Sequence, residues 1–150
     1  MKKKTAKNNR TKLPHEVFQA CEEVDSVAER VKILQEHGTF GIKTLLQANY
    51  KEDVEFDLPA GVPPYKENVG VAGQQHRHFE KHVRQLRHLI KQSPLPAFKK
   101  ELTYIKLLEN LAAEDAKIMI AVKDKNLKGL YKTITEATVR KAFPTLLGDK

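Results

Sequence analysis

Apolar residues recur every three or four positions along most of this chain, and that spacing limits the folds open to it more than any other feature. Residues at this interval share one face of an α-helix. The expected helix ends include Gly38, Pro94 and Pro144. The expected helices cover residues 13–23, 26–38, 40–48, 74–92 and 97–111, with two more that start near residues 114 and 133. The sequence therefore predicts an all-α fold, an irregular bundle of about five to seven helices.

Helix starts and buried faces follow from the same pattern. Ser26 with Glu29, and Thr133 with Glu136, match the capping box, in which two side chains satisfy backbone amides at a helix start. The apolar face of each helix is expected to form the core. For the helix over residues 97–111 the predicted core positions are Phe98, Leu102, Ile105 and Leu108, with Tyr104 as a further candidate.

One segment departs from the helical period. Val54, Phe56 and Leu58 alternate with acids, which is typical of a short, half-buried β element or extended arm over residues 53–58. Prolines then follow closely, and a proline removes a backbone donor and fixes φ. We therefore expect a Pro-rich loop over residues 59–73.

Residues 1–12 are polar and cationic and have no apolar period, so they are expected to form a disordered basic tail. Residues 13–150 are long enough to bury a core and are expected to form a single helical domain. Cys21 is the only cysteine, which excludes an intramolecular disulfide and a cysteine-based zinc site. No apolar run approaches the roughly 18 residues that span a bilayer. These features predict a cytoplasmic protein that does not enter membranes.

The net charge of +8 is concentrated in two places. Six of the eight charges lie in the tail, on Lys2, Lys3, Lys4, Lys7, Arg10 and Lys12. A second basic segment, residues 76–91, has five cationic side chains and Glu80 as its only acid. The rest of the chain is slightly acidic, so a functional interpretation has to explain these two segments.

The second basic segment is amphipathic when it is drawn as an α-helix at about 100° per residue. The cationic line consists of Arg77, Lys81, Arg84, His88 and Lys91, and the opposite side consists of Phe79, Val83, Leu86, Leu89 and Ile90. Such a face is either a solvated surface or a contact surface for phosphate groups or an acidic protein. Membrane-surface binding is disfavoured because the core needs the apolar side. The sequence contains no helix-turn-helix, zinc-finger, K-homology or RNA-recognition signature.

Catalytic and metal-binding motifs are missing from the sequence. His78 and His82 are four residues apart but lack the glutamate that follows the first histidine in zinc proteases. Cys21 lies on an apolar helix face, which is typical of a buried thiol rather than a nucleophile. We expect no enzyme activity, no cofactor and no metal site.

The Pro-rich loop offers a different interpretation, in which the chain binds another protein. Pro63 and Pro64 stiffen the loop, and Tyr65 either presents its ring to a partner or packs the loop onto the helices. Both alternatives remain open from the sequence.

Three stretches of the sequence carry a resemblance when they are taken together. They are LPAGVPPY at 58–65, LLE at 107–109 with EDAK at 114–117 and AVKDK at 121–125, and ITE at 134–136 with KAFP at 141–144. Over about residues 14–147 the chain resembles an uncharacterised family of small proteins of large tailed bacteriophages, especially phages of marine and cyanobacterial hosts. The resemblance implies viral origin and synthesis inside a bacterium. It implies no activity and no catalytic residues.

These observations predict a non-enzymatic phage accessory protein that binds DNA or RNA, or docks on a nucleic-acid complex, through the tail and the basic helix face. The alternative is a protein–protein role, as a virion component or as an inhibitor or adaptor of a host protein. The expected location is the cytoplasm of the host bacterium or the virion. The oligomeric state is left open.

Overall fold

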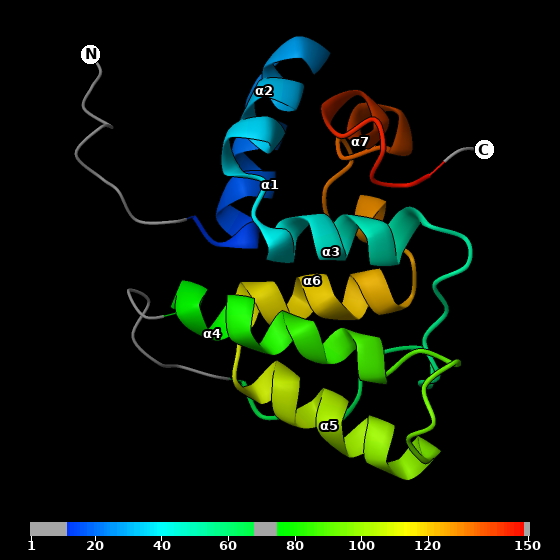
Figure 1. The fold of residues 1–150 in the computed structure, drawn as a ribbon. Coiled ribbons are helices and arrows are strands. Elements are labelled where there is room, and N and C mark those ends of the chain that lie inside the picture. The colour runs from blue at the N-terminus through cyan, green and yellow to red at the C-terminus, as the bar shows by residue number, and fades with distance from the viewer. Residues whose placement is uncertain (1–11, 68–74, 149–150) are drawn as a thin grey trace.

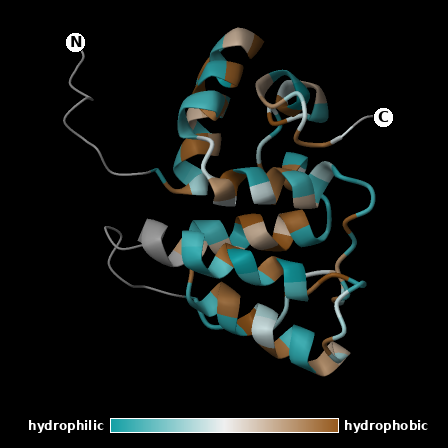
Figure 2. Cartoon of the chain, in the orientation of Figure 1, coloured by the Kyte–Doolittle hydropathy of each residue, from teal (hydrophilic) through white to brown (hydrophobic). Residues whose placement is uncertain are grey.

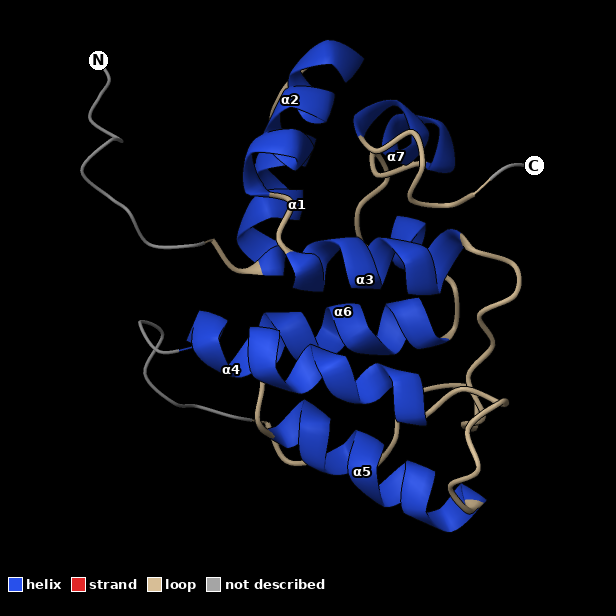
Figure 3. Ribbon diagram, in the orientation of Figure 1, coloured by secondary structure: helices blue, strands red, loops and turns tan. Residues whose placement is uncertain are grey.

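The computed structural model describes residues 12–67 and 75–148, and the side chains of residues 75–78 lie outside that description. Over the described residues the chain contains seven α-helices and no strand (Figure 3). The α-helices are α1 (Pro14–Glu22), α2 (Val27–His37), α3 (Phe40–Tyr50), α4 (Gln75–His82), α5 (Ala97–Glu109), α6 (Ala113–Lys123) and α7 (Glu136–Ala142). Two 3₁₀ helices, η2 (Val83–His88) and η3 (Leu127–Gly129), complete the order. The predicted all-α, irregular bundle is confirmed.

Helix α6 forms the centre of the bundle, and it contacts α1, α3 and α5 (Figure 1). Eight of its eleven residues are buried, so its apolar residues surround the helix instead of forming a single stripe. Helices α1, α2 and α7 lie on one side of α3 and α6, and α4, η2 and α5 lie on the other (Figure 1). Phe18, fully buried in α1, packs its ring 5.5 Å from that of Tyr131 in the segment after η3.

Hydroxyl side chains start three of the helices. Ser26 accepts from the backbone amide of Glu29, as the sequence predicts. At the start of α7 the cap is Thr135, which accepts from the amide of Thr138. The prediction of a box at Thr133 is wrong, because Thr133 donates its amide and its hydroxyl to Glu22 instead. That pairing ties the end of α1 to the segment before α7.

The expected β element over residues 53–58 is reduced to a single antiparallel bridge between Phe56 and Ile90. Asp57 donates its amide to the Leu89 carbonyl at 2.8 Å, and Lys91 donates its amide to the Glu55 carbonyl at 2.9 Å. The alternation still has its physical effect, because Val54, Phe56 and Leu58 pack against the core.

Part of the core predicted for α5 is wrong. Phe98 is 62% exposed and Leu102 is 55% exposed. The helix buries Lys100 in their place, and the Lys100 Nζ donates to Asp57 Oδ2 and to the Ile90 carbonyl, both at 2.9 Å. A buried ammonium is tolerated when it is paired, and its apolar stem packs like a hydrophobic side chain. This pairing rotates the apolar stripe of Phe98 and Leu102 away from the core.

Helices α1 and α6 are joined by an ion pair that predicts a pH dependence of stability. His15 Nδ1 lies 3.0 Å from Oδ1 of the buried Asp115. The hydrogen bond to Asp115 raises the pKa of His15 above its ordinary value of 6.5, and burial opposes the shift. A group whose pKa is higher in the folded protein than in the unfolded chain contributes its full stabilisation at pH values below the unfolded pKa. This stabilisation is lost as the pH rises through the folded pKa.

We therefore expect His15→Gln to remove a component of stability that wild type loses as the pH rises from below the ordinary histidine pKa of 6.5 to above it. Urea unfolding of both proteins across that range measures it. His37, whose pKa is lowered chiefly by burial, is present in both proteins and cancels from the difference. Parallel pH profiles for the two proteins would contradict the assignment.

Candidate nucleic-acid interface

The predicted helix over residues 74–92 divides into two parts, and this changes which cations align. Helix α4 ends at His82 and the chain tightens into η2, in which side chains three residues apart eclipse one another. Val83, Leu86 and Leu89 follow this interval and are all buried. On an exposed side of the same segment lie Lys81, Arg84 and Arg87. We call these three residues the basic stripe.

The only acid of the second basic segment points away from the stripe. Glu80 accepts from the Thr39 hydroxyl at 2.7 Å and from the backbone amide of Gly41 at 3.1 Å. Both donors belong to the start of α3, where free amides and the helix dipole favour a carboxylate. Within the described part of the chain, no ion pair engages the basic stripe. The stripe therefore presents its charge to solvent.

An aromatic ring adjoins the stripe. Phe40, the first residue of α3, is 54% exposed, and the Arg84 guanidinium lies 4.6 Å from its ring centroid. This distance is that of a cation–π contact. Together the two side chains offer a flat apolar surface beside a row of positive charge.

The other predicted cations do not extend the stripe. His88 is exposed and accepts from the Arg87 Nε at 3.3 Å, but its position is one residue off the stripe's interval. Lys91 lies beyond η2 and pairs with Glu55 at 3.3 Å. Lys12 is half-buried, and its charge helps to lower the pKa of His37. The Arg77 side chain lies outside the described residues, as do Lys2, Lys3, Lys4, Lys7 and Arg10.

The sequence prediction missed Arg87 and Phe40. Arg87 leaves the cationic line at 100° per residue and joins it only at the 120° interval of a 3₁₀ helix. Phe40 stands apart from the apolar face of α3, which is formed by Ile42, Leu45 and Leu46. A large apolar residue off the buried face is the signal that could have identified it.

The predicted protein-interaction residues have two different environments. Pro63 and Pro64 line a pocket of about 260 Å³ between the Pro-rich loop and α5. Tyr65 packs against the core and does not present its ring fully to solvent. The loop is held by Lys123, whose buried Nζ donates to the carbonyls of Pro59 at 2.7 Å and Gly61 at 3.0 Å.

Tyr104 lies at the base of this pocket and is 3% exposed. Burial raises the pKa of its hydroxyl, which has no hydrogen-bond partner among the described residues. Val62, 74% exposed, stands at the rim of the pocket. The pocket is thus mostly apolar, with Glu101 as the one charged residue in its lining, and its loop is held in place from within the chain.

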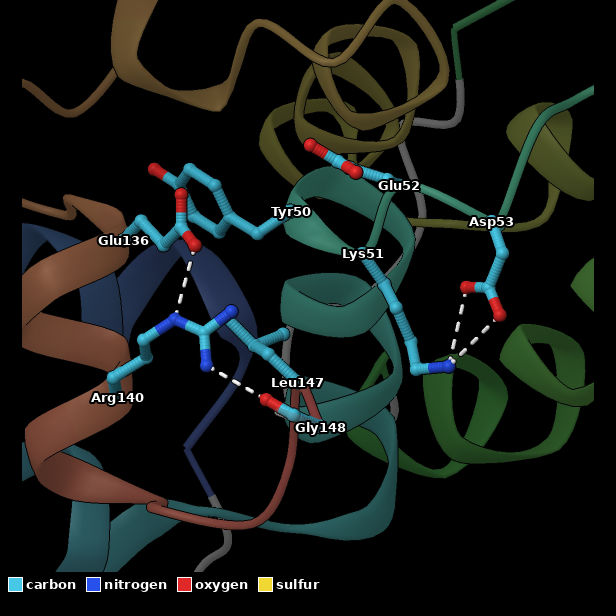
Figure 4. Close-up of a pocket in the computed structure, with 8 residues that line it drawn as sticks. All are labelled: Tyr50, Lys51, Glu52, Asp53, Glu136, Arg140, Leu147 and Gly148. Atoms are coloured by element: carbon cyan, nitrogen blue, oxygen red, sulfur yellow. Dashed lines mark hydrogen bonds and ion pairs between the residues drawn. The ribbon is translucent and has the colours of Figure 1, made fainter. Parts of the chain in front are cut away.

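A second cavity, a cleft of about 630 Å³, lies between the end of α3 and α7 (Figure 4). All of its charged residues except the exposed Glu52 are already paired. Arg140 donates to Glu136 at 3.0 Å and to the Gly148 carbonyl at 2.8 Å, and Lys51 donates to Asp53 at 3.1 Å (Figure 4). These bonds leave the cleft without a strong demand for a charged ligand.

No helix among the described residues is long and apolar enough to cross a membrane. No cluster of three or more His, Cys, Asp or Glu side chains in that part of the chain has the arrangement of a metal site. Cys21 is a free, buried thiol, and burial raises its pKa to about 11, as expected for a structural cysteine.

The fold and the site define a small all-helical protein with an exposed basic stripe beside an aromatic ring. The chain belongs to a protein family of unknown function (DUF6433), whose model matches residues 17–129. No curated protein and no solved structure matches the chain. The matched region includes α4, η2 and the Pro-rich loop.

Proposed function

We propose that this protein is not an enzyme and that it binds nucleic acid through the basic stripe, with the tail over residues 1–12 adding cationic contacts. The observation that carries the proposal is the stripe itself, three aligned cations with no internal ion pair in the described structure. Lys and Arg contacts to phosphates supply sequence-independent affinity that falls with salt. The rise of a 3₁₀ helix spaces Arg84 and Arg87 by about 6 Å along the stripe.

The Phe40–Arg84 pair supports single-stranded DNA or RNA as the ligand. Bases that are not paired in a duplex can stack on an aromatic ring or on a guanidinium plane. A duplex keeps its bases stacked on one another and offers the stripe only its phosphates. Single strands therefore use both parts of the surface, and duplexes use one.

We expect Phe40→Leu to weaken single-strand binding by about tenfold while leaving duplex binding unchanged, because base stacking is lost and the charges are kept. Fluorescence anisotropy with a labelled oligonucleotide, single-stranded and then annealed, measures both affinities. Phe40→Tyr is the matched control, since it keeps an aromatic face. Equal losses on both ligands would contradict the stacking role, and no binding by wild type at low salt would overturn the whole proposal.

We further propose that the protein is made by a large tailed bacteriophage of marine or cyanobacterial hosts. Its place of action would be the host cytoplasm or the virion. The stretches at residues 58–65, 107–125 and 134–144 support this origin by their resemblance to such phage proteins. Mass spectrometry of purified virions distinguishes a packaged protein from one that stays in the cell.

A second candidate function is contact with a phage or host protein, as a virion component or as an inhibitor or adaptor. The pocket between the Pro-rich loop and α5 supports it, because Pro63, Pro64 and the exposed Val62 border an apolar hollow. Affinity capture from a nuclease-treated lysate tests this function. Partners that persist after nuclease and are lost with Val62→Asp support it, and partners lost with nuclease support nucleic-acid binding.

A further inference from the structure

Helix α5 lies at the edge of the molecule, and hydrophobic and hydrophilic residues alternate along it (Figures 1 and 2). The side that faces away from the core is apolar. Phe98 and Leu102 lie one turn apart on this side and are mostly exposed, and the half-buried Ile105 lies one turn further on. The inner side of the helix is fully used, since Lys100, Tyr104, Leu107 and Leu108 are buried. Three large apolar side chains in one row form a larger apolar surface area than one isolated residue does. Such an area is typical of a surface that contacts another protein.

These three residues have the spacing of a coiled-coil seam. Leu102 takes an a position, and Phe98 and Ile105 take the d positions on either side of it. In this frame Glu101 is a g residue, and Lys99 and Lys106 are e residues. All three charged side chains are exposed, and none forms an ion pair within the described parts of the chain. The seam is therefore flanked by negative charge on one side and by positive charge on the other.

The arrangement of charges selects both the partner and its orientation. In a parallel pair of identical helices, each g residue faces the e residue five positions further along the other helix. Glu101 of one copy would then face Lys106 of a second copy, and symmetry would form this pair twice. In an antiparallel pair, e faces e and g faces g, which would set lysine against lysine. The surface is thus complementary to itself in the parallel orientation only.

We propose that α5 is a dimerisation surface and that its occupant is α5 of a second copy of this chain, packed in parallel. The exposed Phe98 and Leu102 and the half-buried Ile105 form the seam, and Glu101 and Lys106 form the flanking ion pairs. The seam extends only about two helical turns. Leu108, at the next g position, is buried inside its own subunit. Glu109, at the next a position, accepts a hydrogen bond from the Lys66 amide at 2.9 Å. The dimer is accordingly a weak one that depends on protein concentration.

Sedimentation equilibrium of the full chain from about 1 μM to about 1 mM tests the association. We expect a monomer–dimer equilibrium. Leu102→Glu should raise the dissociation constant at least about 100-fold, because it places two carboxylates in the seam. Lys32→Gln, on the exposed part of α2, is the matched control because it lowers the net charge by the same one unit, and it should leave the equilibrium unchanged. A monomer at every concentration would overturn the proposal.

Charge reversal tests the pairing itself. Glu101→Lys and Lys106→Glu, each alone, should weaken the dimer about tenfold, because each sets like charges against one another twice. The two changes together should restore wild-type affinity. Equal and additive losses would show that the two residues do not face each other, and would contradict the parallel register.

Cross-linking tests the orientation. Positions 98 and 105 are separated by about 10 Å along the helix. In the parallel dimer, Phe98→Cys and Ile105→Cys should each form a disulfide with their own counterpart on oxidation. An antiparallel pair brings at most one of these positions to its counterpart, so cross-linking of only one would overturn the proposal. The native Cys21 is buried and serves as the internal control for unspecific oxidation.

Discussion

Replacing Arg84 and Arg87 together by glutamine should lower the affinity for a single-stranded oligonucleotide by about tenfold or more near physiological salt. It should also reduce the slope of log affinity against log salt by about 1.4, because each lost phosphate contact on a single strand accounts for about 0.7. Both side chains are exposed and neither forms an internal ion pair in the described structure, so the double variant should fold normally. Anisotropy titrations at four or five salt concentrations give both quantities.

The matched control for this prediction is the double variant Lys32→Gln and Lys128→Gln. It changes the net charge equally, and both lysines are exposed on α2 and η3, away from the stripe. Its salt slope should stay close to that of wild type. If both double variants lose affinity to the same degree, binding depends on overall charge, and the basic stripe is not an interface.

The second large effect concerns stability. Phe18→Ala should lower the free energy of unfolding by about 3–5 kcal/mol, because it leaves a cavity where the ring packs against Tyr131. Phe98→Ala, the same change at a site that is 62% exposed, should change it by about 0.5 kcal/mol or less. Denaturant unfolding at low protein concentration, where self-association does not contribute, measures both.

The comparison between the two phenylalanine variants tests whether α5 has the orientation seen in the structure or the one that the sequence pattern predicts. Both residues lie on apolar faces at helical spacing, and periodicity alone assigns both to the core. Comparable losses at the two positions would mean that α5 is rotated relative to the described orientation. In that case the proposed seam on α5 would also be wrong.

Periodicity predicted most helices of this fold because burial on one face imposes a repeat that local sequence records. The start of α2 at Ser26 was also predictable, because a helix cap depends on residues only three positions apart in the sequence. The bounds of α1, α2 and α3 accordingly agree with expectation to within two or three residues.

Tertiary contacts determined what periodicity could not. Lys100 is buried because Asp57, far away in sequence, accepts from it, and this pairing turned Phe98 outward. The tightening of α4 into η2 accompanies the backbone bonds that residues 89 and 91 form with residues 57 and 55. The candidate site was therefore predicted only in part. Its location and charge were evident from the sequence, whereas the alignment of Arg87 and the partnership of Phe40 depend on how helices pack.

The inward position of Glu80 has a consequence for how this surface can evolve. A Cβ at Gly41 would lie 2.4 Å from Phe79 Cε2 and 2.6 Å from Glu80 Oε2, so this junction of α3 and α4 tolerates little variation. The basic stripe beside it is less constrained, since none of its cations forms an ion pair within the described part of the chain. Substitutions at Lys81, Arg84 and Arg87 can therefore tune the strength of an interaction at little cost to folding. Under the proposed function, ligand affinity and fold stability are therefore separable traits, and natural selection can act on one while the other stays constant.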